Sequence, residues 1–342
     1  MKKRLAICIP TYNRADCLNF TLNTIKRQGE DVQVCISDNA STDRTEELCR
    51  QYQGIDIKYG RNKTNLGFDE NLRLAILLSD AEWCWTMGDD DMILPGGIKT
   101  LLDDIGRLDE KTNAIYVNCD CTDSRKATEF RFNEQRTLQI DEAPKLSLTR
   151  GFCTMCIRTE TARNAIRNMA LSPEKMRFWQ QNRLFMDCVQ RTGRISIEPK
   201  PLMRALAAAN DTPEYVPQRM EDVMAEEPLY LQYELTRLEE YGWFPYVQDS
   251  TISLARGELR RNIFACKNAK LKPIKDACTP MFRYICHKRH ADLYIILLDL
   301  ATLFMPAMIV VYDLKRRFVH QRKKPLDLMS CPCGKEHNKE KR

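Results

Sequence analysis

The sequence lacks both glycine-rich motifs that most often hold nucleotides in α/β proteins. No G-x-G-x-x-G follows the first predicted strand, and no G-x-x-x-x-G-K-[ST] occurs anywhere in the 342 residues. In dinucleotide-binding and P-loop proteins, these motifs place phosphate groups at the N-terminus of a helix. Their absence argues against the commonest dehydrogenases and nucleotidyltransferases that are built on doubly wound sheets.

An export signal is not expected either. The basic start Met1-Lys2-Lys3-Arg4 leads directly into a short apolar strand that is too short for the core of a signal peptide. The 15 cysteines are odd in number and show no short repeated spacing, and Cys8 and Cys35 lie inside apolar runs where a thiol behaves as a small hydrophobe. We therefore expect a reduced cytoplasmic protein without a disulfide framework.

The overall composition is that of a globular protein with an uneven charge distribution. Apolar residues make up 43% of the chain and charged residues 29%, and the length suits one large domain with an appendage or two domains. The net charge of +6 is concentrated in the last eighty or so residues, which predicts a basic surface that faces an anionic partner. That region has no recognisable nucleic-acid reading motif, so nucleic acid is not expected as the partner.

The first 120 residues alternate between apolar strand patterns and helical patterns. Such alternation predicts βαβ units, and hence an α/β fold with a mostly parallel sheet that helices cover on both faces. Strands are predicted at residues 5–9, 32–37, 55–59, 83–87 and 114–117, and helices at 16–27, 43–52, 68–78 and 95–108. Further strands are predicted at 152–157, 194–197 and 201–207, with a helix at 174–191 and a mainly helical region from about residue 217.

Polar clusters follow four of the predicted strands. In parallel α/β sheets, ligands bind beyond the carboxyl ends of the strands. These positions are therefore the expected location of a binding site. The clusters are Pro10-Thr11-Tyr12-Asn13, Asp38-Asn39-Ala40-Ser41-Thr42-Asp43, Asn65-Leu66-Gly67 and Gly88-Asp89-Asp90-Asp91.

The acidic triplet is the most informative of these clusters. Three adjacent carboxylates repel one another unless a cation lies among them, and Mg²⁺ or Mn²⁺ often bridges carboxylates and phosphate oxygens. A metal and a nucleoside diphosphate are thus implied together. The alternative is a solvated acidic turn that caps the helix beginning at Pro95. Asp38 also has two interpretations: it contacts a base or ribose, or it stabilises a local turn. Gly67 either allows close approach of the backbone to a ligand or forms a simple turn.

The segments that contain these clusters, residues 7–14, 37–43, 65–67 and 88–95, together resemble glycosyltransferase family 2, the inverting family with the GT-A fold. The segments Gly88-Asp89-Asp90-Asp91 and Asn65-Leu66-Gly67-Phe68-Asp69 are most similar to those of abequosyltransferase-type enzymes of bacterial O-antigen and polysaccharide assembly. The resemblance implies a nucleotide-sugar-binding half at residues 1–120, an acceptor-binding half at 121–212 and a basic helical region at 213–342. It also implies transfer of a sugar from a nucleoside diphosphate to an acceptor hydroxyl, with Mn²⁺ or Mg²⁺ as cofactor.

The resemblance also implies roles for individual residues. Asp90 falls on the metal-binding position and Asp89 on the position that contacts ribose or donor sugar, while Gly88 replaces the first Asp of the common motif. Asp91 is a second carboxylate at the donor, and Asp38 faces the base. The residues expected to bind the donor are Pro10, Thr11, Asn13, Asp38, Asn39, Asn65, Gly67 and Asp89.

The general base is not assigned by the sequence. An inverting transfer needs a carboxylate to take the proton of the acceptor hydroxyl, and in the family it lies roughly ninety residues after the metal motif. The corresponding stretch, 178–182, contains no carboxylate. Glu174 and Asp187 flank it and are the two catalytic alternatives. The missing carboxylate leaves open a non-catalytic, membrane-associated protein that binds nucleotide sugars.

A membrane surface is the expected location of the C-terminal region. Residues 291–312 form an apolar run of 22 residues. Through this run and directly after it, one polar stripe recurs every seven residues, formed by Asp292, Asp299, Pro306 and Asp313. A spanning helix would hold Asp299 near the bilayer centre at a cost of about 2.5–3.5 kcal/mol. An interfacial helix followed by basic residues avoids that cost. A buried helix remains an alternative. A lipid-linked or oligosaccharide acceptor at the inner face of the plasma membrane fits this expectation.

Overall fold

The computed structural model describes residues 2–121, 136–139, 152–170, 184, 187–188 and 194–205. All of them belong to one compact unit. Most of the helix predicted at 174–191 lies outside the described residues, as do the region from 213 onward and the apolar run at 291–312. Within the described part of the chain, no helix has both the length and the apolar character needed to cross a membrane.

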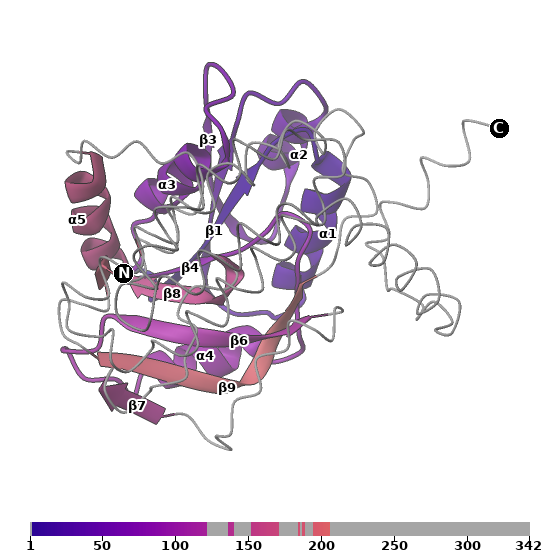
Figure 1. The fold of residues 1–342 in the computed structure, drawn as a ribbon. Coiled ribbons are helices and arrows are strands. Elements are labelled where there is room, and N and C mark those ends of the chain that lie inside the picture. The colour runs from indigo at the N-terminus through magenta and orange to yellow at the C-terminus, as the bar shows by residue number, and fades with distance from the viewer. Residues whose placement is uncertain are drawn as a thin grey trace, which may run out of the picture. The chain divides into compact units, whose positions relative to one another are not determined.

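The elements alternate as predicted through the first half of the chain (Figure 1). They are β1 (Leu5–Thr11), α1 (Ala15–Lys26), β2 (Gln33–Asp38), α2 (Thr45–Gln51), β3 (Asp56–Arg61), α3 (Phe68–Leu78), β4 (Trp83–Thr86), β5 (Met92–Ile93), α4 (Gly97–Ile105), β6 (Ala114–Cys121), β7 (Arg136–Gln139), η2 (Phe152–Thr154), β8 (Met155–Arg158), α5 (Thr159–Ala170) and β9 (Arg194–Ala205).

The described strands form one nine-stranded sheet in the order β3-β2-β1-β4-β8-β6-β9-β5, with β7 paired to β9. The first four strands of this order are parallel, so the carboxyl ends of β1, β2, β3 and β4 meet at one edge. Beyond β4 the sheet is mixed, because β8 is antiparallel to both of its neighbours. The predicted α/β fold is confirmed, and the parallel arrangement holds for the half of the sheet that carries the polar clusters.

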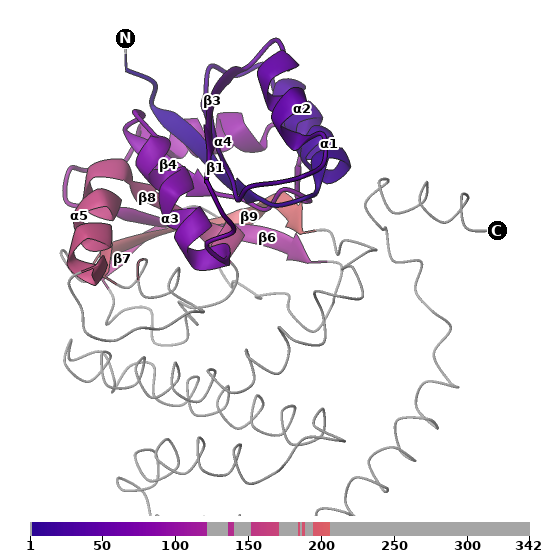
Figure 2. The ribbon, with the colours of Figure 1, turned by 90° about the horizontal axis from the view of Figure 1, so that it is seen from above.

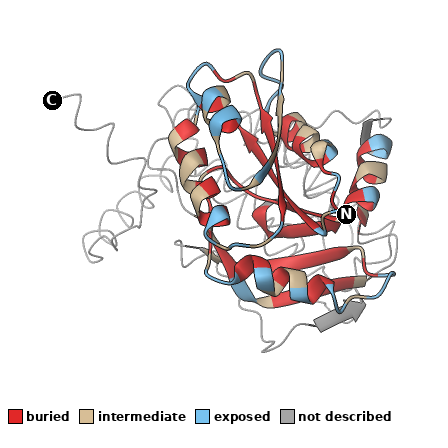
Figure 3. Ribbon diagram, turned by 180° about the vertical axis from the view of Figure 1, so that it is seen from behind, coloured by how far each residue is buried: buried red, intermediate tan, exposed pale blue. Residues whose placement is uncertain are grey.

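Helices cover both faces of the parallel strands (Figure 2). Helices α1 and α2 lie on one side, and α3 lies on the other side against β1 and β2. Helix α1 forms because Leu18, Leu22 and Ile25 recur at helical spacing, and all three are buried. Residues of the sheet are mostly buried, whereas exposed residues concentrate on the outer faces of helices and in loops (Figure 3).

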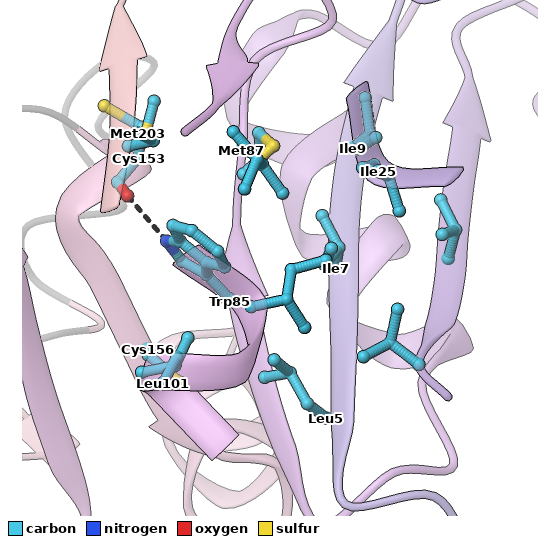
Figure 4. Packing of buried hydrophobic residues seen from close by; sticks show 14 of the residues in the cluster. Leu5, Ile7, Ile9, Ile25, Trp85, Met87, Leu101, Cys153, Cys156 and Met203 are labelled. Atoms are coloured by element: carbon cyan, nitrogen blue, oxygen red, sulfur yellow. Dashed lines mark hydrogen bonds between the residues drawn. The ribbon is translucent and has the colours of Figure 1, made fainter. Parts of the chain in front are cut away.

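The core between the sheet and α1 and α4 is built by alternate residues of the strands. Leu5, Ile7 and Ile9 of β1 belong to it, together with Trp85 of β4 (Figure 4). Full burial of such a side chain contributes about 1.5–3 kcal/mol. The indole Nε1 of Trp85 donates to the carbonyl oxygen of Cys153 at 2.8 Å, so the one polar atom of this large side chain is satisfied.

Three predicted elements differ in the structure. The strand predicted at 152–157 begins as the 3₁₀ turn η2 and becomes a strand only at Met155. The two strands predicted at 194–197 and 201–207 are one strand, β9, although it contains Pro199 and Pro201. Its pairing with β6 passes from Glu198 directly to Met203, so neither proline has to donate a ladder hydrogen bond.

Helix α5 (Thr159–Ala170) was not predicted. Its buried residues include Ala162, Ala165 and Ile166, and two of these three are alanines. A face of such small side chains gives a weak periodic signal in the sequence. The helix packs against α3, so it extends the cover of that face of the sheet.

Candidate active site

The ends of β1 and β4 are joined by side chains of the predicted site. The Thr11 hydroxyl donates to Asp89 Oδ2 at 2.8 Å. The Arg14 guanidinium donates to Asp89 Oδ1 at 2.6 Å through Nη1 and to Asp90 Oδ2 at 2.7 Å through Nη2. Arg14 was not predicted as a site residue. The available signal was its position, directly after the polar cluster of β1 in a chain with an acidic triplet at the neighbouring strand end.

The acidic turn is held in one conformation by its own backbone and by α1. Asp91 Oδ2 accepts the backbone N–H of Gly88 at 2.9 Å. The Thr21 hydroxyl lies 2.9 Å from the carbonyl oxygen of Asp89 and 2.8 Å from that of Asp91, and it can donate to one of them at a time. A Cβ at Gly88 would lie 2.7 Å from Asp91 Oδ2 and 2.9 Å from Asp90 Oδ1. The replacement of the family's usual Asp by Gly88 therefore makes room for the two carboxylates that follow.

Burial and charge act in opposite directions on this turn. Burial of Asp89 and the neighbouring Asp90 carboxylate raise the pKa of Asp89 to about 7, against the opposing effects of Arg14 and Thr11. Burial lowers the pKa of Arg14, but Asp89 and Asp90 outweigh it and raise that pKa above its ordinary value. Arg14 is therefore a permanent positive charge next to the carboxylates.

The donor set fits a divalent cation that arrives with a phosphate ligand. Among the described residues, no three His, Cys, Asp or Glu side chains are arranged to enclose a metal. Both oxygens of Asp89 accept hydrogen bonds, and Asp91 is bonded to Gly88. The Asp90 side chain is 18% exposed, against 5% for Asp89. Mg²⁺ and Mn²⁺ sites commonly use one or two carboxylates and complete their shell with phosphate and water. The assignment of Asp90 as the metal ligand stays a prediction.

A second cluster joins the residue after β2 to the loop between β3 and α3. The Asn39 amide donates to Asn65 Oδ1 at 2.7 Å and lies 3.2 Å from the Gly67 carbonyl oxygen. Asn39 Oδ1 accepts the backbone N–H of Leu66 at 2.8 Å. Gly67 has a φ of 85°, and nothing lies within 4 Å of a Cβ built on it. Its role is therefore conformational, at the start of α3, and is not one of close approach.

Asp38 is buried and already engaged. Its Oδ1 accepts the Ser41 backbone N–H at 2.8 Å, and its Oδ2 accepts the Tyr59 hydroxyl at 2.6 Å. Burial, followed by the Asp38 carboxylate, raises the pKa of Tyr59 above its ordinary value. The Asp38 side chain is 0% exposed and Arg61 Nε lies 3.4 Å from it. In this conformation Asp38 shapes the loop after β2, and its contact with a base stays a prediction.

The loops after β1 and β2 are tied together by Asn13. Its Oδ1 accepts the Thr42 backbone N–H at 2.7 Å, and its own N–H donates to Ser41 Oγ at 2.9 Å. Asn13 and Ala40 both have positive φ angles, 54° and 64°. A non-glycine residue in this region is strained, and such strain is found preferentially at functional sites. Pro10 is buried in β1 opposite Ser37.

The described residues do not test the two candidates for the general base, Asp187 and Glu174. Asp187 is helical and partly exposed, and its flanking residues on the N-terminal side lie outside the described part of the chain. Glu174 itself lies outside it. The identity of the general base stays a prediction with these two alternatives.

Comparison with known proteins matches residues 6–163 to Glycosyl transferase family 2. The chain is 41% identical over 103 residues to abequosyltransferase RfbV of Salmonella typhimurium, covering 28% of this chain and 31% of that protein. It is 48% identical over 59 residues to validoxylamine A glucosyltransferase of Streptomyces hygroscopicus subsp. jinggangensis, covering 16% of this chain and 14% of that one. The matches thus span less than a third of these relatives. The resemblance read from the motifs is confirmed for this domain.

Solved structures share the fold at low sequence identity. S. aureus TarS (residues 1–349) superposes with a TM-score of 0.60 at 18% identity and covers 82% of this chain and 81% of its own. The mannosyltransferase PcManGT of Pyrobaculum calidifontis, solved with GDP-Man and Mn²⁺, has a TM-score of 0.53 at 11% identity, with 91% and 83% covered. At these identities the likeness shows the GT-A architecture alone.

Proposed function

We propose that this chain, whose residues 6–163 match Glycosyl transferase family 2, transfers a sugar from a nucleoside diphosphate to an acceptor hydroxyl with inversion. The observation that carries the proposal is the convergence of Thr11, Arg14, Asp89 and Asp90 at the carboxyl ends of two neighbouring parallel strands. A cationic guanidinium beside an acidic turn offers both signs of charge to a bound metal–diphosphate pair.

Each described residue has a distinct task in this proposal. Asp90 holds the cation, and Mg²⁺ or Mn²⁺ supplies charge neutralisation for the departing diphosphate. Thr11 and Asp89 fix the end of β1 against the acidic turn, so the carboxylate of Asp90 is presented by a rigid element. Asn39 and Gly67 set the loop before α3 at the rim of the site. Asp187 or Glu174 accepts the proton of the acceptor hydroxyl.

The nature of donor and acceptor is supported by the relatives alone. TarS has been solved with UDP-GlcNAc and PcManGT with GDP-Man, so proteins of this architecture hold nucleotide sugars. The sequence match to an abequosyltransferase supports a role in O-antigen or related polysaccharide assembly. We propose a lipid-linked or oligosaccharide acceptor and a cytoplasmic enzyme attached to the inner face of the plasma membrane through its basic C-terminal region.

A thermal titration with nucleotides tests the donor site first. The purified chain is heated with UDP, CDP, GDP or dTDP, each with and without Mn²⁺, beside Asp90→Asn. We expect one nucleotide to stabilise the protein in a metal-dependent manner, by about 2.7 kcal/mol at a hundredfold excess over its dissociation constant. Asp90→Asn should lose the metal-dependent part. Asp103→Asn, an exposed carboxylate of α4 paired with Lys99, is the matched control and should keep it.

Turnover then separates an enzyme from a binding protein. The corresponding nucleotide sugars are incubated with Mn²⁺, and release of nucleoside diphosphate is followed over time. Release that is lost in Asp90→Asn and retained in Asp103→Asn supports the transferase. Saturable binding without release, with or without a supplied lipid-linked acceptor, would instead support the non-catalytic alternative.

A further inference from the structure

Arg14 divides one guanidinium between two adjacent carboxylates. It lies directly after Asn13, at the N-terminal end of α1, and reaches across to the turn after β4. Nη1 donates to Asp89 at 2.6 Å, and Nη2 donates to Asp90 at 2.7 Å. The usual bidentate pair engages both oxygens of one carboxylate. Here each carboxylate keeps one oxygen for another partner.

The two bonds differ in how easily they can be exchanged. Asp89 is held twice, by Arg14 and by the Thr11 hydroxyl, and its side chain is 5% exposed. Asp90 is more exposed, at 18%, and it pairs with Arg14. Solvent and a soluble ion can therefore reach the Asp90 bond, whereas the Asp89 bond is protected.

A divalent cation and the guanidinium compete for Asp90. A cation on that carboxylate would lie within a few ångströms of Arg14, and like charges at such a distance in a partly buried site repel strongly. The guanidinium cannot relieve this by losing its proton, because an arginine side chain stays charged in proteins. It has to move from Asp90, and its planar fork suits phosphate oxygens as well as carboxylates.

From this geometry we propose that Arg14 is an exchangeable counter-ion. It occupies Asp90 while the site is empty and transfers that bond to the diphosphate when cation and nucleotide bind together, with Asp89 as its fixed anchor. The inference rests on the proposed function for the identity of the diphosphate. It assigns Arg14 as a positioning residue that makes metal binding depend on the nucleotide, so that the cation is taken up as part of the donor complex.

Direct measurement of Mn²⁺ binding tests the exchange without any turnover. Free Mn²⁺ is followed by electron paramagnetic resonance during titration of the full chain, alone and with each of UDP, CDP, GDP and dTDP. For the wild type we expect weak binding of Mn²⁺ alone and binding about tenfold or more tighter with the preferred nucleotide, a coupling of ordinary allosteric size. Arg14→Gln should bind Mn²⁺ alone about tenfold more tightly than the wild type and show little further gain from nucleotide.

Two further variants locate the effect. Arg14→Lys keeps the charge and loses the fork, so it should still suppress binding of Mn²⁺ alone but bind the metal–nucleotide pair less tightly. Arg44→Gln removes an exposed arginine that lies just before α2 and pairs with Asp16 of α1, and it should behave as the wild type. Circular dichroism of each variant confirms that it is folded, and Arg14→Lys carries the test if Arg14→Gln is not.

The outcomes separate the two proposals. Unchanged or weaker Mn²⁺ binding by Arg14→Gln in the absence of nucleotide overturns the counter-ion, even if the wild type binds a metal–nucleotide pair. If Arg14→Lys carries the test, the counter-ion is overturned when this variant binds the metal–nucleotide pair as tightly as the wild type does. If the wild type binds no nucleotide while Arg14→Gln gains a Mn²⁺ site that Asp90→Asn removes, the donor site fails and the competition for Asp90 stands.

Discussion

The Thr11 hydroxyl donates to the Asp89 carboxylate at 2.8 Å across 78 positions of the sequence, and it joins the end of β1 to the turn after β4. Both residues are almost fully buried. A neutral hydroxyl that satisfies a buried carboxylate is a contact whose loss leaves an acceptor unpaired. This hydrogen bond thus fixes the end of β1 and the turn after β4 relative to each other before any ligand binds.

Replacement of that hydroxyl should weaken both the fold and the site. Thr11→Val keeps the shape of the side chain and removes the donor, so we expect a loss of about 1–3 kcal/mol in the free energy of unfolding. Metal-dependent stabilisation by nucleotide should fall as well, because the turn is no longer held to β1. Urea unfolding and the thermal titration measure the two effects. The control is Thr100→Val, at a half-buried position of helix α4. Equal losses of unfolding free energy and of nucleotide stabilisation in both variants would contradict the assigned role.

Gly88 should tolerate no side chain. A Cβ there meets carboxylate oxygens of Asp91 and Asp90 at 2.7 and 2.9 Å, and these have to turn aside. Gly88→Ala is therefore expected to lower the affinity for Mn²⁺ with nucleotide by about tenfold, or 1.4 kcal/mol. Stability should change less, because the displaced atoms are the ends of side chains. Titration calorimetry measures the affinity, and an affinity equal to that of the wild type would show that the carboxylate positions do not matter.

Asn39 should be required for order in the loop before α3. Its side chain bonds to Asn65, Leu66 and Gly67, and it also accepts from the Asn62 amide at 3.1 Å. Asn39→Ala removes all these contacts at once, so amide hydrogens of residues 62–67 should exchange faster, as measured by mass spectrometry. Asn23→Ala, on helix α1, is the control and should leave that loop protected. Unchanged exchange in Asn39→Ala would mean that backbone contacts alone hold the loop.

Local patterns predicted the parallel half of the sheet well. Helix α3 occupies the predicted residues 68–78, and β1 to β4 differ from their predictions by one or two residues at their ends. These elements have strong periodicity and turn residues at their ends. Beyond residue 120 the structure depends on long-range pairing, such as the passage of β9 over two prolines, which no local pattern reveals.

The candidate site shows the same division between local and long-range information. The four polar clusters could be identified from their positions after strands, and the structure brings Thr11 to Asp89 and Asn39 to Asn65. Which partner each side chain would choose could not be predicted. Asp38 bonds to Tyr59, from a strand read only as apolar, and Arg14 bridges two acidic residues from 75 and 76 positions away. Such choices depend on three-dimensional proximity and on charge balance.

A buried pair of carboxyl groups outside the acidic turn predicts pH-dependent stability. Asp104 of α4 and Glu198 of β9 are 2% and 3% exposed. Burial, followed by the hydrogen bond and like charge of Glu198, raises the pKa of Asp104 from its ordinary 3.8 to about 8, and Arg107 opposes the shift only partly. One carboxyl proton shared between the two side chains avoids two buried charges.

The direction of the pH effect follows from where that proton is held. Between about pH 4 and pH 8 the folded chain keeps a proton on Asp104 that the unfolded chain has released, so the stabilising contribution is complete below pH 4 and declines as pH rises towards 8. The decline is at most about 1.4 kcal/mol per pH unit for one proton.

Asp104→Asn retains a hydrogen-bond donor towards Glu198 without an ionising group, so urea unfolding across this range should show a flatter pH dependence. The exposed neighbour Asp103→Asn should keep the wild-type slope, because its side chain lies at the surface and pairs with Lys99. An Asp104→Asn slope equal to that of the wild type would place the pH dependence elsewhere in the chain.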